Sequence, residues 1–215
     1  PDFDLKEKWT GRKGMLAALK KEKLRTPPGT KFVYSDIGFI VLGEIAEKIS
    51  GIDLNNFAKS QIFDDLIDRR TFFNPFRPVV FDNWVSVPGG VIVEATQSIR
   101  DIAPTENIRG QNSYLGSKFD GNDQTGNTIL RGAVHDPTSF RMGGVAGHAG
   151  LFSTADDLAR YCQMLLNGGT LDGKRVMSAQ TVAKMTTPVV VSESGDARGL
   201  GWDMNTSFSS NRGEL

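Results

Sequence analysis

Tyr34, Ser35 and Asp36 are three consecutive residues whose side chains could take part in proton transfer. They follow a rigid Pro-Pro-Gly turn at 27–29 and precede an apolar, helix-forming segment. The start of a helix carries a partial positive charge and free N–H groups, so a phenol beside it could have a lowered pKa and act as a general base. The plainer interpretation is that Asp36 caps the helix and that Tyr34 is a half-buried aromatic residue.

A glycine-rich segment, GGVAGHAGLFST at 143–154, is the second candidate. Glycines allow the backbone to approach a ligand closely, and they also allow tight turns with positive φ. Because a helix is predicted directly after the segment, it could also cradle a phosphate. It matches neither G-x-x-x-x-G-K-[ST] nor G-x-G-x-x-G, however. Ligand contact and simple turn formation are therefore equal alternatives.

The histidines and the cysteine do not form a recognisable site. His135 and His148 lack the H-x-x-x-H spacing of a helical zinc pair, and Cys162 is the sole cysteine. His135 and Asp136 are neighbours, which does not establish a serine triad, and no G-x-S-x-G elbow is present. We predict no metal and no cofactor. Cys162 falls in a helical apolar stripe, where a small core side chain is expected.

Composition narrows the classes of partner. The sequence has 25 basic and 25 acidic residues, so it lacks the positive excess typical of a nucleic-acid-binding protein. The basic run at 20–25 is expected on the solvated face of a short helix. No apolar run approaches the ~20 residues that span a bilayer, so we predict no membrane segment.

Apolar periodicity predicts the helices that would position the first candidate. One helix is expected over 11–24, and a second begins near Asp36 and ends at Gly51. Asp53 is expected to cap a third helix. The apolar stripe of the second helix is predicted to consist of Ile37, Val41, Ile45 and Ile49, with Ile40 and Leu42 alongside.

A further helix is predicted after the glycine-rich segment. Thr154 and Asp157 have the spacing of a capping box, and Asn167-Gly168-Gly169 would end the helix. Ser178 is expected to cap a shorter helix after it. The apolar face of the longer helix is predicted to comprise Leu158, Tyr161, Cys162, Leu165 and Leu166.

Between Thr71 and Arg141 the periodicity is lost. Turn signals recur at 75, 88–90, 110, 121–122 and 126–127. We interpret this region as surface excursions over a helical core, with one short strand in GGVIVEA at 89–95. A second strand is predicted for GLGWDM at 199–204.

Two of these segments together resemble a known family. PPGTKFVYSDIGFIVLGEIAEKISG at 27–51 and GGVAGHAGLFSTADDLARYCQMLLNGG at 143–169 are similar to the serine β-lactamase/penicillin-binding-protein superfamily, above all its class C β-lactamase-like esterases, D-amino peptidases and DD-peptidases. The resemblance implies an α+β fold: mainly the helical part of a β-lactamase/transpeptidase-like fold, with few strands of its antiparallel sheet, in a single partial domain over 1–215. Because peptidoglycan-related relatives act outside the cytoplasm, it favours a periplasmic or extracellular location.

The resemblance also implies roles for individual residues. In that family the serine of an S-x-x-K motif attacks an acyl carbon, and the lysine and the tyrosine of a Y-x-N motif handle its proton. Tyr34 matches that tyrosine and Asp36 the third position, which makes both catalytic candidates. The stretch Gly147, His148, Ala149 and Gly150 matches a part of the substrate cleft. The implied partner is a small-molecule acyl substrate: an ester, an amide or a peptidoglycan-like peptide.

The sequence departs from the family pattern at three points. No serine is followed three residues later by lysine, and no late [HK]-[TS]-G motif is present. Asp36 replaces the asparagine, and an ionised aspartate only accepts hydrogen bonds, which favours an esterase or peptidase over a β-lactamase. We therefore expect an internal fragment that is inactive by itself. The alternatives are a non-catalytic binding or scaffold domain and a phosphate-binding module built on the glycine-rich segment.

Overall fold

The computed structural model describes residue 9 and residues 11–66, 70–74, 79–81, 84–86, 92–94, 102–107, 129–207 and 209. The turns predicted at 75, 88–90, 110, 121–122 and 126–127 all lie outside these residues. The chain divides into two compact units, one with residues 1–22, 35–57 and 71–152 and the other with residues 23–34, 58–70 and 153–215. The single partial domain over 1–215 stays a prediction.

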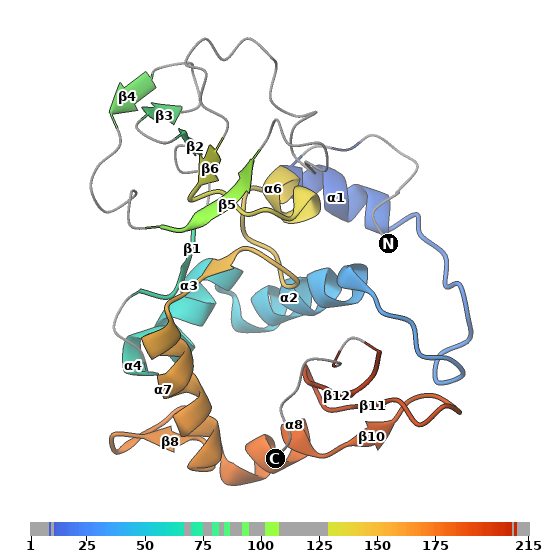
Figure 1. Cartoon of the computed structure of the whole chain (residues 1–215). Helices are drawn as coiled ribbons and strands as arrows, with labels where there is room; N and C mark the ends of the chain where they lie inside the picture. Colours follow the sequence, from blue (N-terminus) through green and yellow to red (C-terminus); the bar gives the residue numbers. More distant parts are fainter. Residues whose placement is uncertain are drawn as a thin grey trace. The chain divides into compact units, whose positions relative to one another are not determined.

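The first unit is built on helices α1 (Gly11–Leu19), α2 (Asp36–Ser50), α3 (Leu54–Ala58) and α6 (Pro137–Met142). α1 packs beside α6, as Figure 1 shows in blue and yellow. α1 ends at Leu19 and not at the predicted Leu24, because the charged residues that follow are exposed and have no apolar face to bury. The core of this unit consists of Trp9, Met15, Ala18, Ile40, Met142 and Ala146.

α2 buries only part of the apolar face that was predicted for it. It begins at Asp36 and ends with Gly51 in the left-handed conformation, as expected. Its buried residues are Ile40 and Gly43, whereas the predicted stripe residue Ile49 is 82% exposed. The stripe prediction is therefore wrong for Val41, Ile45 and Ile49, which are exposed, whereas Ile40 is buried and Ile37 packs against the core. The physical reason is that Gly43 lets another backbone segment approach this side of the helix, which brings Ile40 inside.

The region expected to be surface excursions contains a five-stranded antiparallel sheet, so that expectation is wrong. Its order is β4-β3-β2-β6-β5, which can be followed in Figure 1. The strand predicted within 89–95 is confirmed as β4. The other strands escape pattern analysis because three or four residues are too few to show alternation. The strands are β2 (Val79–Phe81), β3 (Trp84–Ser86), β4 (Ile92–Glu94), β5 (Pro104–Asn107) and β6 (Ile129–Arg131).

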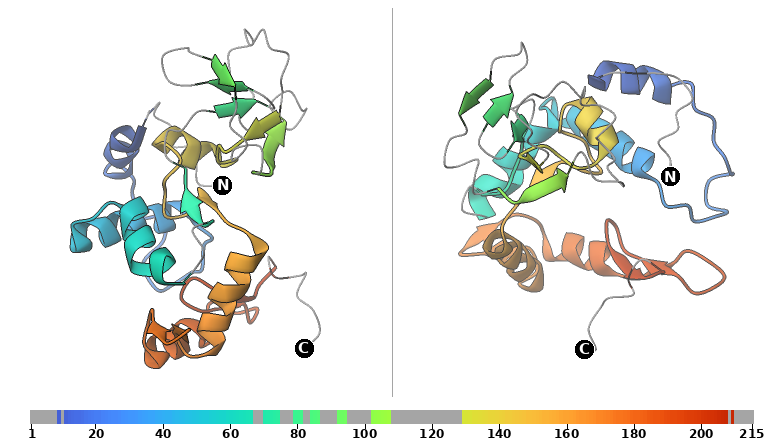
Figure 2. Two further views of the ribbon diagram at one scale, coloured as in Figure 1. Left: turned by 90° about the vertical axis from the view of Figure 1, so that its left-hand side faces the viewer. Right: turned by 45° about the horizontal axis from the view of Figure 1, so that its top comes forward.

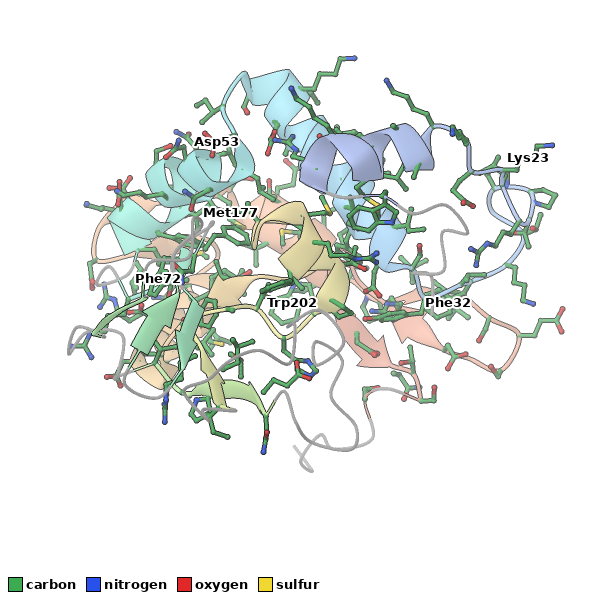
Figure 3. All side chains as sticks on the ribbon, turned by 90° about the horizontal axis from the view of Figure 1, so that it is seen from above. Lys23, Phe32, Asp53, Phe72, Met177 and Trp202 are labelled. Atoms are coloured by element: carbon green, nitrogen blue, oxygen red, sulfur yellow. The ribbon has the colours of Figure 1, made fainter. Side chains whose placement is uncertain are left out.

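A shorter ladder follows the glycine-rich segment. β1 (Phe72–Phe73) pairs antiparallel with β7 (Leu151–Phe152). The rings of Phe72, labelled in Figure 3, and Phe152 stack with their centroids 5.9 Å apart. The end of the glycine-rich segment is therefore held in a strand pair.

The second unit is centred on α7 (Ala155–Leu166), shown in orange in Figure 2. Its apolar cluster consists of Leu66, Met164, Leu165, Leu171 and Val182. The remaining elements are the π-helix η1 (Lys59–Phe63), α4 (Asp64–Leu66), α8 (Ala179–Thr186), β8 (Thr170–Leu171), β9 (Lys174–Arg175), β10 (Val189–Val190), β11 (Ala197–Arg198) and β12 (Asp203–Asn205). The strand predicted at 199–204 is present only at its end, because Gly199 and Trp202 form a turn.

Three of the predicted caps are confirmed, but the predicted face of α7 is partly wrong. The side chains of Thr154, Ser178 and Asp53 each accept a backbone N–H three residues later. On α7 the buried apolar residues are Met164 and Leu165, whereas Leu158, Leu166 and Cys162 are exposed. Cys162 is therefore no core residue: the helix turns the side that contains Met164 toward the cluster.

Within the described residues, no helix is both long enough and apolar enough to cross a membrane.

Candidate active site

The first turn of α2 is capped by Ser35 and not by Asp36. The Ser35 Oγ accepts the N–H of Gly38 at 3.1 Å, and the Ser35 backbone is extended, as a capping residue requires. Asp36 is thus the first residue of the helix, where the helix dipole favours a negative charge. The interpretation of Asp36 as the cap is wrong, because two capping residues are adjacent here and the structure uses the first.

Tyr34 lies in extended chain directly before this cap. It is 51% exposed, so its ring is not sealed in an apolar core. The chain passes from the second unit into the first between Tyr34 and Ser35. A cleft shared by the Tyr34 hydroxyl and the backbone of Gly147–Gly150 therefore stays a prediction.

The glycine-rich segment folds into a compact loop that touches α2. Gly143, Gly144 and Gly150 have positive φ angles of 99°, 83° and 122°. A Cβ atom added to Gly147 would overlap the carbonyl oxygen of Phe39, and one added to Gly43 would lie 3.2 Å from the Gly147 Cα. The loop and α2 thus meet backbone to backbone, and glycine is required on the loop side.

A hydrogen bond of the His148 side chain attaches the same loop to the start of α6. Its Nε2–H donates to Asp136 Oδ1 at 2.9 Å, and the two side chains are 3% and 24% exposed. The same oxygen accepts the N–H of Ser139 at 2.6 Å, as the N-cap of α6. The Ser139 hydroxyl donates to the carbonyl oxygen of Ala149 at 2.9 Å. Two hydrogen bonds therefore tie the loop to the start of α6.

The contacts of Asp136 keep it charged. Partial burial alone would raise the pKa of Asp136, but the hydrogen bonds from His148 and from the Ser139 N–H outweigh it and hold this pKa below its ordinary value. A charged carboxylate is the stronger acceptor for the imidazole N–H.

Sequence reasoning missed the pairing of Asp136 with His148. The neighbouring His135 goes elsewhere, with its Nε2 3.9 Å from Glu106 Oε2. Asp136 precedes α6 in the sequence and His148 follows it. No spacing rule pairs two such residues, so only the fold brings them together. Within the described part of the chain, no three His, Cys, Asp or Glu residues come together that could hold a metal ion. The metal-free site stays a prediction.

Neither serine near these groups is placed as a nucleophile. Ser35 caps α2, and Ser139 is fully buried with its hydroxyl directed to a backbone carbonyl. The geometry therefore offers an exposed phenol, a carboxylate at a helix start and a firmly held loop.

Comparison with known proteins gives a consistent result. The model of the Beta-lactamase family matches residues 1–213. A protein of Escherichia coli (strain K12) named "Putative D-alanyl-D-alanine carboxypeptidase" is 35% identical over 196 residues, which are 88% of this chain and 38% of that protein. A protein of the same name from Salmonella heidelberg (strain SL476) is 33% identical over 192 residues, 88% of this chain and 39% of that protein. The chain thus spans about two fifths of the length of these relatives.

Solved structures share the fold. The octameric penicillin-binding protein homologue from Pyrococcus abyssi is 18% identical, with a TM-score of 0.50 over 89% of this chain and 34% of that chain. A D-stereospecific amidohydrolase from Streptomyces is 17% identical, with a TM-score of 0.51 over 88% of this chain and 44% of that chain. The predicted fold class is confirmed: the chain has the α+β fold of these proteins, in part.

Proposed function

Because the chain belongs to the beta-lactamase family, we propose that the protein is a serine hydrolase that acts by acyl transfer, of the D-amino peptidase or DD-carboxypeptidase kind. The observation that carries the proposal is the start of α2. Ser35 Oγ caps the helix, so the Asp36 carboxylate is not used as the cap, and the ring of Tyr34, directly before the cap, is 51% exposed.

Each residue has a distinct role in this proposal. Tyr34 shuttles the proton between the serine nucleophile and the leaving group. Asp36, when ionised, accepts hydrogen bonds only, so we expect it to face an N–H of an amide or peptide substrate rather than a carbonyl oxygen. The backbone of Gly147, Ala149 and Gly150 forms part of the cleft wall.

The substrate class follows from the same residues and from the names of the relatives. The E. coli relative is named for D-alanyl-D-alanine carboxypeptidase activity, and one structural neighbour is titled a D-stereospecific amidohydrolase. With Asp36 in place of an amide donor, we expect a peptide that ends in D-amino acids to be a better substrate than a β-lactam.

The experiment uses the protein expressed from its complete reading frame. Hydrolysis of a D-alanyl-D-alanine peptide, a p-nitrophenyl ester and a chromogenic β-lactam is measured, and a fluorophosphonate adduct is mapped by mass spectrometry. We expect peptide or ester hydrolysis to exceed β-lactam hydrolysis, with the adduct on a serine of an S-x-x-K motif. A folded protein that hydrolyses none of the three and takes up no probe would contradict the proposal.

A second candidate is a non-catalytic binding or scaffold domain. The observation that favours it is that no serine in these 215 residues is followed by lysine at the third position. For residues 1–215 alone we expect no fluorophosphonate labelling, because an unactivated serine hydroxyl is a poor nucleophile. Stoichiometric labelling of one serine in this segment, lost on denaturation, would show that the nucleophile lies within it.

A further inference from the structure

We propose that Asp136 is a positioning residue of this active site, which acts through His148 to hold the loop Gly147–Gly150 against α2. The inference rests on the proposed function, because the loop matters for catalysis only if it lines the substrate cleft.

The first step is the anchor. Asp136 caps α6, and α6 is fixed to the core of the first unit. Met142 at the end of α6 is buried, and the Arg141 guanidinium lies 4.1 Å from the ring centroid of Trp9. A single oxygen, Asp136 Oδ1, accepts both the Ser139 N–H and the His148 Nε2–H. The position of the imidazole is therefore set by the start of a packed helix.

The second step concerns the direction of His148. Its side chain is 3% exposed and is turned to Asp136, whereas the residue as a whole is only partly buried and its neighbour Gly147 is exposed. What His148 presents to solvent is therefore mainly backbone. Its part in the cleft is to hold the backbone of Gly147 and Ala149 in place.

The third step is the contact with α2. Gly147 lies against the carbonyl of Phe39, which is one helical turn after Asp36, and against Gly43 in the next turn. There is no side chain in this contact to absorb a shift. A displacement of the loop therefore moves backbone directly against the helix that carries Asp36 at its start.

The fourth step is a second fastening. The Ser139 hydroxyl holds the carbonyl oxygen of Ala149, on the far side of His148 from Gly147. The loop is thus held at the side chain of one residue and at the backbone of the next. Loss of either hydrogen bond therefore frees the loop only in part. Loss of the Asp136 carboxylate should have the larger effect, because Asp136 also orients Ser139 through its backbone N–H.

The test distinguishes two roles of Asp136: the capping of α6 and the hydrogen bond with His148. Asp136→Ser keeps a capping oxygen for the Ser139 N–H but is too short to reach the imidazole, whereas Asp136→Asn keeps acceptors for both. The matched control is Asp53→Ser, because Asp53 caps α3 in the same way and accepts the N–H of Asn56 at 3.0 Å. All variants are made in the protein from its complete reading frame.

We expect Asp136→Ser to lower kcat/KM about 10- to 100-fold, because small misplacements of positioning groups have effects of that order. Asp136→Asn should stay within about threefold of the parent, and Asp53→Ser should leave kcat/KM unchanged. Amide hydrogen exchange should rise at residues 146–151 in Asp136→Ser, but not in Asp136→Asn or Asp53→Ser. Ser139→Ala leaves the Asp136–His148 pair intact, so it should lower kcat/KM and raise the exchange at residues 146–151 by smaller amounts. It replaces Asp136→Ser as the test variant if Asp136→Ser does not fold.

Two results would overturn the inference. One is unchanged amide hydrogen exchange at residues 146–151 in both Asp136→Ser and Ser139→Ala. The other is raised exchange in these variants while their kcat/KM stays equal to that of an active parent. A parent that hydrolyses no acyl substrate, but whose variants show the expected exchange, would overturn the proposed function and leave the fastening of the loop supported. The exchange measurement needs no substrate, so the two failures are distinguishable.

Discussion

Around Met164, apolar side chains from α4, α7, β8 and α8 pack together, whereas the loop around Gly147 is held by backbone contacts and by three polar side chains, those of Asp136, Ser139 and His148. Apolar packing depends mainly on volume and tolerates exchange of one hydrophobic residue for another. Hydrogen bonds and backbone contacts depend on particular atoms at particular places. The comparison teaches that the loop is a region in which the positions of individual atoms matter more than the volume of the side chains.

The sharpest test compares two tyrosines. Tyr34→Phe, in the protein from its complete reading frame, should lower kcat about 10²- to 10⁴-fold with little change in stability, because the ring remains and only the proton-transferring oxygen is lost. The matched control is Tyr161→Phe in α7, where the half-buried ring packs against the Met164 cluster. It should leave kcat unchanged. A Tyr34→Phe enzyme within about threefold of the parent would reassign Tyr34 to structure.

The next test asks how tolerant the apolar cluster is. Met164→Ala should lower the free energy of unfolding by about 2–5 kcal/mol, because Met164 is fully buried and its removal leaves a cavity. Met164→Leu should cost less than about 1.5 kcal/mol, since the volume is nearly kept. Urea unfolding measures both. Equal losses in the two variants would show that the cluster depends on shape as strictly as the loop does.

A single added carbon tests the loop. Gly147→Ala should lower the free energy of unfolding by about 1–3 kcal/mol, because its Cβ would overlap the Phe39 carbonyl and the backbone must move. Gly38→Ala in α2 is the control: its Cβ would meet only Ser35 side-chain atoms, at 3.7 and 3.8 Å, and a helical Gly→Ala change gains up to ~1 kcal/mol. A Gly147→Ala protein as stable as the parent would remove the close contact as an explanation.

The smallest effect expected is a pH dependence of the Asp136 contacts. The pKa of Asp136 is lowered in the folded state, chiefly by His148 and Ser139 against the opposing effect of burial. Its contribution to stability is therefore present above the unfolded pKa of about 3.9 and is lost as pH falls through the lower folded value. The difference in unfolding free energy between the parent and Asp136→Asn should shrink between about pH 5 and pH 3. A difference that grows over this range would have the wrong sign.

The features that the sequence predicted are local ones. A capping side chain bonds an N–H three residues later, so Thr154, Ser178 and Asp53 could be recognised from a few letters of sequence. At the start of α2 the same rule was off by one residue, because Ser35 and Asp36 are both good caps.

The features that were missed depend on contacts between distant parts of the chain. α2 carries Ile, Val, Leu and Phe on several sides, so composition does not say which side meets a partner. The ladder that pairs Val80 with Arg131 joins strands of three residues. The bond between Asp136 and His148 joins the N-cap of α6 to a residue of the loop that follows the helix. Tyr34 and the glycine-rich segment were candidates from local patterns, whereas the catalytic role of Tyr34 and the cleft role of Gly147–Gly150 came from family resemblance.

The meeting of Gly43 with Gly147 has an evolutionary consequence. Neither position can gain a side chain unless the opposing backbone moves away, so a substitution at one of them changes which substitutions the other can accept. The two positions lie in different segments of the chain, yet they should be inherited as a coupled pair. In homologues whose α2 lies further from the loop, both positions could accept a side chain. The residue at position 43 of the helix would then indicate which residues position 147 of the loop can accept.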